Sequence, residues 1–149
     1  MKIGDIAPDF ELESNIGDKV KLSTYFKKKK IILFFYVKNN TPGCNSEVNG
    51  IRNYHSKISD KYEIIGINQD SVESHANFCQ KHDLPFKILS DTNKKVAASY
   101  QAKGILGAYT KRITYLIVLD GRIENIIEGI GASNHIEFVQ SLADSQAYN

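Results

Sequence analysis

The 149-residue sequence lacks tryptophan and has only two cysteines, three prolines and one methionine. Two widely separated cysteines do not form the disulfide framework of a small secreted protein. No apolar stretch approaches the length of a membrane-spanning helix, and the first five residues, Met1 to Asp5, lack the apolar core of a signal peptide. We therefore expect a cytoplasmic protein that does not enter a membrane.

Strong charge of either sign is also missing. The formal charge is +2, and the only run of basic residues, Lys27 to Lys30, precedes an apolar strand and is interpreted as a solvated turn. We therefore expect no nucleic-acid partner. The segment Gly129 to Ser133 lacks the spacing of a phosphate-binding loop. The four histidines are scattered, so neither a metal site nor a cofactor is expected; they are His55, His75, His82 and His135.

Hydrophobic residues make up 42% and charged residues 24%, which is typical of a soluble globular protein, and residues 1–149 are predicted to form a single domain. Apolar patterns predict strands near 10–13, 19–22, 31–37, 62–68, 86–89, 112–119 and 122–128. Helices are predicted at 42–58, 71–82, 94–100 and 135–144. Asp70 and Glu73 have the spacing of a capping box, Pro85 is expected to stop the second helix, and Asp120-Gly121 suits a hairpin turn. The alternation predicts an α/β layered domain.

The most informative residue is Cys44, in Thr41-Pro42-Gly43-Cys44 directly after the apolar strand. Thr41 can cap a helix, and Pro42 suits its first turn, where a missing N–H group costs nothing. Cys44 would then lie in the first turn, where unpaired N–H groups and the helix dipole favour a negative charge. This setting favours the thiolate, which is the reactive form of cysteine.

Residues 36–47 resemble the peroxidatic-cysteine segment of the peroxiredoxins, and are most similar to the Q-type branch, also called bacterioferritin comigratory proteins. The resemblance extends to Pro8-Asp9-Phe10, to 84–86 with 89–91 and to 112–117, and so covers nearly the whole chain. It implies a thioredoxin-like fold, with a central mixed β-sheet flanked by helices and a short N-terminal extension. It also implies a thiol peroxidase without a cofactor.

The resemblance assigns roles to four residues. Cys44 is the peroxidatic nucleophile, and the hydroxyl of Thr41 is expected beside its sulfur. Arg112 is expected to stabilise the thiolate and to polarise the O–O bond, and Glu47 to orient Arg112. The alternatives are a plain N-cap for Thr41, an ordinary surface arginine for Arg112 and a solvated first-turn carboxylate for Glu47. Val37 departs from the family, which usually has a proline there. We expect activity to survive this difference, and the shape of the pocket and the sensitivity of the thiol to oxidation to be the properties that it affects.

A cysteine sulfenic acid formed at Cys44 needs a second thiol. Many Q-type members have a resolving cysteine five residues downstream, where this chain has Asn49. The other thiol, Cys79, lies in the next predicted helix, where some members carry their resolving cysteine. Val72, Ala76 and Cys79 also follow a helical apolar spacing, so Cys79 is either a candidate resolving cysteine or a core residue. As a resolver it would require both helices to unwind in part, because a disulfide needs Cα atoms within about 7 Å.

The predicted function is a thioredoxin-dependent peroxidase that reduces hydrogen peroxide and organic hydroperoxides through a cysteine sulfenic acid. A peroxide sensor or redox relay, and a one-cysteine peroxidase reduced by an external thiol, are the alternatives. A thiol–disulfide oxidoreductase is disfavoured, because Thr41 and Glu47 stand where a Cys-x-x-Cys motif would have its second cysteine. A monomer or weak dimer is expected.

Overall fold

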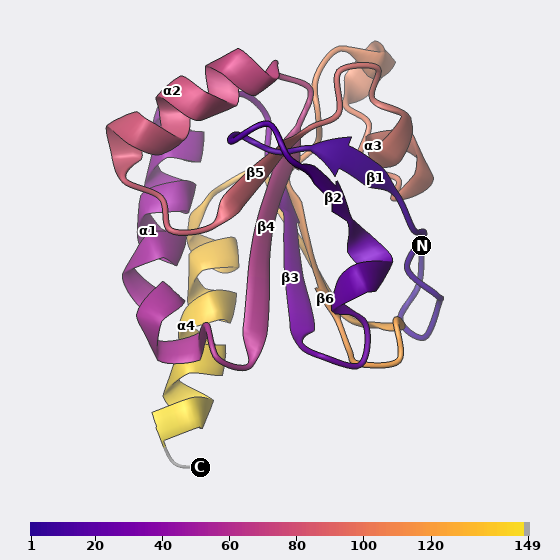
Figure 1. Ribbon diagram of the computed structural model, residues 1–149, viewed down its shortest axis with the longest axis vertical. Helices are drawn as coiled ribbons and strands as arrows, with labels where there is room; N and C mark the ends of the chain where they lie inside the picture. The colour runs from indigo at the N-terminus through magenta and orange to yellow at the C-terminus, as the bar shows by residue number, and fades with distance from the viewer. Residues whose placement is uncertain (148–149) are drawn as a thin grey trace.

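The computed structural model describes residues 1–147 and consists of a five-stranded sheet covered on both faces (Figure 1). The strands are β1 (Glu11–Glu13), β2 (Lys19–Lys21), β3 (Lys30–Phe35), β4 (Tyr62–Asn68), β5 (Lys87–Ser90), β6 (Ile113–Ile117) and β7 (Ile123–Glu128). The helices are α1 (Pro42–Ile58), α2 (Val72–His82), α3 (Lys95–Ser99) and α4 (Ser133–Ala147), with 3₁₀ turns η1 (Leu22–Tyr25) and η2 (Ile105–Gly107).

The central sheet is mixed, with strand order β5-β4-β3-β6-β7. β3 pairs in parallel with β4 and antiparallel with β6, so it lies in the middle of the sheet. β6 and β7 form the hairpin expected at Asp120-Gly121, and Gly121 adopts φ +85°, which a glycine accepts without strain. This order brings the start of β6 beside the end of β3, the two positions from which the site is built.

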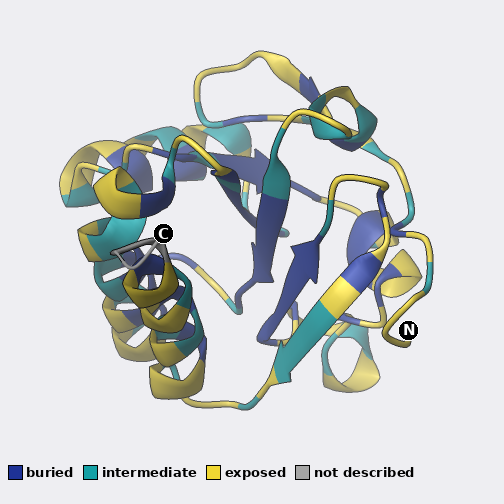
Figure 2. Cartoon of the chain, turned by 90° about the horizontal axis from the view of Figure 1, so that it is seen from below, coloured by how far each residue is buried: buried dark blue, intermediate teal, exposed yellow. Residues whose placement is uncertain are grey.

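The side chains of β3 alternate between two cores. Ile31, Leu33 and Phe35 pack on the face covered by α3 and the N-terminal segment, whereas Ile32 and Phe34 pack on the face covered by α1, α2 and α4. Figure 2 shows the central strands buried and the outer faces of the helices exposed. Burial on both faces explains why β3 is one continuous apolar run rather than a pattern of alternating polarity.

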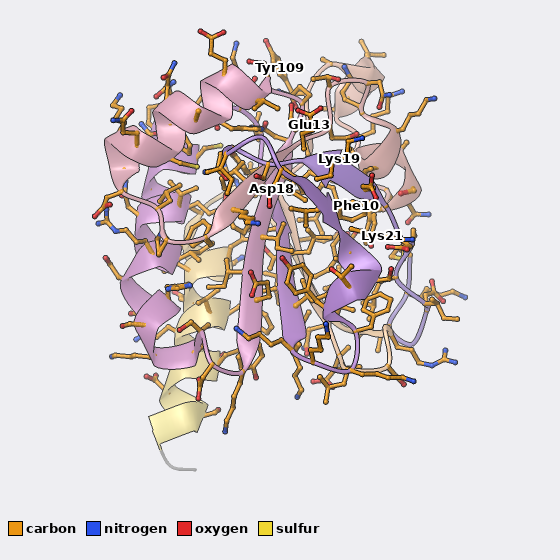
Figure 3. All side chains as sticks on the ribbon, in the orientation of Figure 1. Phe10, Glu13, Asp18, Lys19, Lys21 and Tyr109 are labelled. Atoms are coloured by element: carbon orange, nitrogen blue, oxygen red, sulfur yellow. The ribbon has the colours of Figure 1, made fainter. Side chains whose placement is uncertain are left out.

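The N-terminal extension packs on the central sheet. β1 and β2 form a hairpin, and Phe10 meets the ring of Tyr100 edge to face, with centroids 6.1 Å apart. Asp18, in the turn of the hairpin, forms an ion pair with Lys87 of β5. Figure 3 labels Phe10, Asp18 and three other charged side chains of the hairpin, Glu13, Lys19 and Lys21. The expected fold class, a mixed sheet flanked by helices with an N-terminal extension, is confirmed.

One local prediction about α2 was wrong and another was confirmed. The capping box does not form, because the Asp70 carboxylate instead accepts hydrogen bonds from the backbone N–H of Asn39 and from Asn68. Ser71 caps the helix and accepts from the backbone N–H of Ser74 at 3.1 Å. At its other end, α2 ends at His82 as predicted, with Asp83 at φ +51° as its C-cap and Pro85 two residues further along. No helix among the described residues is both long enough and apolar enough to cross a membrane.

Candidate active site

Cys44 is the third residue of α1 and is fully buried. Thr41 has the extended backbone of an N-cap residue and Pro42 is the first helical residue, as the sequence predicts. The thiol therefore sits where backbone N–H groups lack helical partners and where the helix dipole favours an anion. Cys44 belongs to the core beneath α1 and α2, so its polar surroundings come from a few specific side chains.

The hydroxyl of Thr41 does not cap α1. It donates to the backbone carbonyl of Lys38 at 3.0 Å, and α1 has no side-chain cap bond from Thr41. The plain N-cap interpretation of this side chain was therefore wrong. With its hydrogen committed to Lys38, the oxygen of Thr41 can still accept a hydrogen bond from a ligand.

Arg112 reaches Cys44 from the start of β6. Its Nη2 lies 3.4 Å from Cys44 Sγ, its Nη1 donates to Glu47 Oε1, and its Nε donates to the backbone carbonyl of Ile130 at 3.0 Å. Burial lowers the pKa of Arg112, but Glu47 and Cys44 outweigh burial and raise it above its usual value. The surface-arginine interpretation is wrong, because only 7% of Arg112 is exposed and all three of its nitrogens have partners.

Glu47 lies one turn after Cys44 and is fully buried, so it is not the solvated carboxylate of the alternative interpretation. Burial raises the pKa of Glu47 to about 7, against the lowering effect of Arg112. Its Oε2 has no hydrogen-bond partner within residues 1–147. Gly43 leaves room for the guanidinium, because a Cβ at this position would lie 3.1 Å from Arg112 Nη2.

A cavity of about 310 Å³ opens beside Arg112. Apolar side chains from Val37, Ile105, Tyr109 and Ile130 line it, and Ile105 and Ile130 are themselves largely exposed. Arg112 faces this cavity and also contacts Cys44, so it connects the solvent-accessible space with the buried sulfur. The site thus combines a thiol, a fixed cation and an apolar entrance.

Comparison with known proteins shows the family. The AhpC/TSA family matches residues 3–126. "Peroxiredoxin Bcp" of Bacillus subtilis is 37% identical, with 97% of this chain and 96% of the relative covered, and "Peroxiredoxin Bcp" of Escherichia coli is 33% identical, with 93% of each covered. This chain is a peroxiredoxin of the Bcp, or Q-type, branch.

Solved structures agree with this family. Peroxidoxin BcpB from Mycobacterium tuberculosis has a TM-score of 0.88 at 29% identity, with 97% of each chain covered. A mutant of Xylella fastidiosa PrxQ has a TM-score of 0.87 at 25% identity, with 99% of this chain and 98% of that chain covered. The thioredoxin-like fold and a peroxidase activity follow from membership of the family.

In this peroxiredoxin, Val37 stands where the family usually has a proline, and its backbone is held in another way. The side chain of Gln69 donates to the Val37 carbonyl at 3.0 Å and accepts from the backbone N–H and hydroxyl of Thr110. Gln69 therefore ties the wall of the cavity at Val37 to the wall at Thr110. The Val37 carbonyl is thereby held in place, although valine lacks the ring with which a proline would fix φ.

Cys79 lies in α2 and is 6% exposed. It belongs to the same core as Cys44, and both thiols are free in the described chain. Burial raises the pKa of the Cys79 thiol to about 12, so at neutral pH this residue is a protonated core side chain. The core interpretation therefore describes the resting structure, and a resolving role requires a rearrangement.

Contacts with α1 fix the part of α2 that carries Cys79. Asn49 Nδ2 lies 3.2 Å from His82 Nδ1, and Arg52 Nη1 donates to the His82 carbonyl at 2.7 Å. Asn49, which replaces a nearby resolving cysteine, thus helps to hold α2 in place. We call the Asn49–His82 and Arg52–His82 contacts the α2 latch.

Sequence reasoning missed three polar residues around the site, namely Gln69, Thr110 and His135. His135 is fully buried, and its Nδ1 is 2.7 Å from Thr114 Oγ1 and 3.9 Å from Glu47 Oε2. No local spacing signals these residues, because each contacts the site from a different strand, loop or helix.

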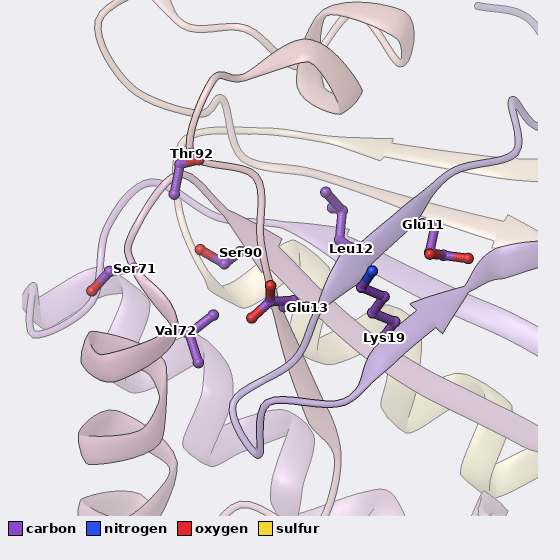
Figure 4. A pocket seen from close by; sticks show the side chains of 8 residues that line it. All are labelled: Glu11, Leu12, Glu13, Lys19, Ser71, Val72, Ser90 and Thr92. Carbon is purple, nitrogen blue, oxygen red and sulfur yellow. The ribbon is translucent and has the colours of Figure 1, made fainter.

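A second cavity of about 370 Å³ lies between the N-terminal hairpin and the start of α2 (Figure 4). Its lining residues include no cysteine and no residue of the Cys44 site; they are Glu11, Leu12, Glu13, Lys19, Ser71, Val72, Ser90 and Thr92. With two carboxylates and one lysine, it has no cluster of one charge that would define a ligand.

Proposed function

We propose that this peroxiredoxin is a thioredoxin-dependent peroxidase in which Cys44 attacks hydrogen peroxide and organic hydroperoxides. The observation that carries the proposal is the 3.4 Å contact between Arg112 Nη2 and Cys44 Sγ beside the cavity that Arg112 also lines. A positive charge at this distance favours the thiolate and lies where charge develops on the peroxide.

The first step is the displacement of one peroxide oxygen from the other. The Cys44 thiolate attacks the terminal oxygen, an S–O bond forms, and the O–O bond breaks. The sulfur is oxidised to the sulfenic acid, and the leaving oxygen takes a proton and departs as water or an alcohol. Arg112 stabilises the leaving oxygen, the free lone pairs of the Thr41 hydroxyl accept the hydrogen of the peroxide, and Glu47 orients Arg112.

The second step returns the enzyme to its reduced form. Cys79 loses its proton and its thiolate attacks the sulfenic acid sulfur; a Cys44–Cys79 disulfide forms, the S–O bond breaks, and the leaving hydroxide takes a proton and departs as water. Thioredoxin, or a similar dithiol protein, then reduces the disulfide by exchange. The free state of both thiols in one core supports this pairing, while the burial of Cys79 requires α1 and α2 to loosen first.

The apolar entrance supports organic hydroperoxides as substrates besides hydrogen peroxide. Val37, Ile105, Tyr109 and Ile130 offer an alkyl group a surface on the way to Arg112. We further propose that the protein is cytoplasmic, a compartment in which thioredoxin is kept reduced, and that it acts as a monomer or weak dimer.

Steady-state peroxide loss coupled to thioredoxin tests the proposal. The wild type should turn over, Cys44→Ser should be inactive, and Cys79→Ser should consume about one equivalent of peroxide and then stall. Retained turnover in Cys44→Ser would remove Cys44 from the mechanism.

One observation favours an alternative mechanism. The Cys79 thiol is buried with a pKa of about 12, which suits a core residue better than a nucleophile. Normal thioredoxin-coupled turnover by Cys79→Ser would therefore establish a one-cysteine peroxidase whose sulfenic acid is reduced by an external thiol. Oxidation without turnover in the wild type would instead indicate a peroxide sensor or redox relay.

A further inference from the structure

Arg112 is oriented by two acceptors, and one of them is a loop carbonyl. Nε donates to the carbonyl of Ile130, which lies between β7 and α4. The side chain of Ile130 is 96% exposed, so it does not anchor this loop in a core. The position of the carbonyl, and with it the direction of the guanidinium, must therefore be fixed by another residue.

That residue is His135, in the first turn of α4. Its Nε2 lies 3.0 Å from the carbonyl of Gly129, the neighbour of Ile130. A carbonyl can only accept, so Nε2 carries the hydrogen, and Nδ1 is then the acceptor for the hydroxyl of Thr114 at 2.7 Å. Gly129 has φ +146°, a conformation that side chains rarely adopt, so the loop turns sharply where His135 holds it.

His135 also faces the second acceptor of Arg112. Its Nδ1 is 3.9 Å from Glu47 Oε2, too far for a hydrogen bond. Because Nδ1 already receives the hydrogen of Thr114, His135 offers Glu47 no hydrogen that would compete with Arg112. Burial lowers the pKa of His135, the hydrogen bond to Gly129 raises it, and the charge of Arg112 lowers it again; the net lowering favours the neutral ring.

We propose that His135 is a positioning residue of the peroxidase site: its Nε2–H fixes the Gly129–Ile130 backbone and thereby directs Arg112 toward Cys44. The inference rests on the proposed roles of Cys44 and Arg112. The proposal adds a connection from α4, through the loop at Gly129 and Ile130, to Arg112 at the start of β6. His135 contacts neither peroxide nor sulfur, so its effect must pass through Arg112.

Two substitutions separate the hydrogen bonds of His135. In His135→Gln, the amide nitrogen extends to about the position of Nε2 and can still donate to Gly129. In His135→Asn, the shorter side chain offers an oxygen to Thr114 but no longer reaches Gly129. Both variants lose one contact and both make α4 pack less well, so a purely structural histidine predicts similar losses.

The rate of Cys44 oxidation by hydrogen peroxide is the readout, measured by quenching with a thiol-alkylating reagent and mass spectrometry. We expect His135→Gln to stay within about threefold of the wild type and His135→Asn to be slower by about tenfold or more. In an Arg112→Met background, His135→Asn should slow oxidation no further, although it should still lower the free energy of unfolding. Equal rates in the two histidine variants, or an undiminished loss in the Arg112→Met background, would overturn the proposal.

Thr114→Val provides a variant in which His135 remains in place. It removes the hydroxyl that donates to Nδ1 and conserves the shape of the side chain, so a smaller loss of rate is expected, again absent in the Arg112→Met background. A loss that persists in that background would count against the proposal. Different results would contradict the proposed function itself. They are peroxide consumption by Cys44→Ser through another residue, or oxidation of Cys44 at the wild-type rate in the single variant Arg112→Met.

Discussion

The two cysteines of this peroxiredoxin lie in the same core but have opposite surroundings. Cys44 begins a helix and contacts the guanidinium of Arg112, whereas Cys79 lies near the end of α2, where burial raises its pKa to about 12. We therefore expect unequal reactivity from two similarly buried thiols, because among the described residues Cys44 has a cation beside it and Cys79 does not.

The largest difference expected is in the first reaction with peroxide. Cys79→Ser should form a sulfenic acid at Cys44 at the wild-type rate, whereas Cys44→Ser should form none at Cys79 on the same timescale, a difference of at least about a hundredfold. A sulfenic-acid-specific label followed by mass spectrometry would measure both. Labelling of Cys79 in Cys44→Ser at a comparable rate would mean that the surroundings of the two thiols do not decide their reactivity.

Arg112 accounts for the next largest part of the difference. Arg112→Met should slow oxidation of Cys44 by on the order of a hundredfold, because it removes the charge that stabilises the thiolate and the leaving oxygen. Arg112→Lys keeps the charge but cannot hold Glu47, Ile130 and the sulfur at once, so an intermediate rate is expected.

Arg122→Met is the matched control for this experiment. Arg122 is exposed and pairs with Asp120 on the surface, and the proposed mechanism gives it no role at the thiol. Its removal should leave the oxidation rate unchanged. If both arginine variants oxidised Cys44 equally slowly, a general effect of net charge would explain the result, and the contact between Arg112 and Cys44 would not be its cause.

Glu47 should make the Cys44 side of the core sensitive to pH. Its pKa rises from 4.5 to about 7 on folding, so between these values the folded protein holds a proton that the unfolded chain has lost. Stability from this group is therefore complete below about pH 4.5 and is lost as the pH rises to about 7. The loss amounts to roughly 3 kcal/mol at about 1.4 kcal/mol per pKa unit.

Denaturant unfolding of Glu47→Gln and wild type under reducing conditions between pH 4.5 and 7.5 would measure this effect. The stability of the wild type relative to the variant should fall across the range. His75, whose pKa is lowered to about 4 by burial, produces the opposite slope in both proteins, so it cancels in the difference. A difference that stays constant with pH would show that Glu47 is ionised throughout, held in that state by Arg112.

The two cysteine regions also differ in how far the sequence predicts them. The Cys44 region follows from adjacent residues, since Thr41, Pro42 and Cys44 set the start of α1, and the bounds of α1 agree with the prediction. Arg112 could be assigned only by the family resemblance, because its contact with Cys44 depends on the pairing of β3 with β6.

The remaining polar residues could not be predicted, because their partners are chosen by the tertiary structure. Asp70 does not cap α2, because its carboxylate accepts a hydrogen bond from the backbone N–H of Asn39, in the loop before α1. Gln69 and His135 have no local pattern, since one spans two walls of the cavity and the other joins α4 to β6 and a loop. A side chain that satisfies distant backbone groups leaves a signal only in three dimensions.

The smallest expected effect concerns the α2 latch, which holds the end of α2 against α1. Arg52→Ala removes the hydrogen bond to the His82 carbonyl, worth about 1 kcal/mol, and so should favour loosening of α2 about fivefold. The Cys44–Cys79 disulfide should then form about fivefold faster after oxidation, while the oxidation step itself is unchanged. Gel mobility without reductant would follow formation of the disulfide, and amide exchange across α2 would follow its loosening.

Asn53→Ala, at an exposed neighbouring position of α1, is the control and should alter neither rate. If Arg52→Ala loosens α2 without speeding the disulfide, the barrier to resolution lies in the first turn of α1, where Cys44 must leave Arg112, and the latch only stabilises the fold.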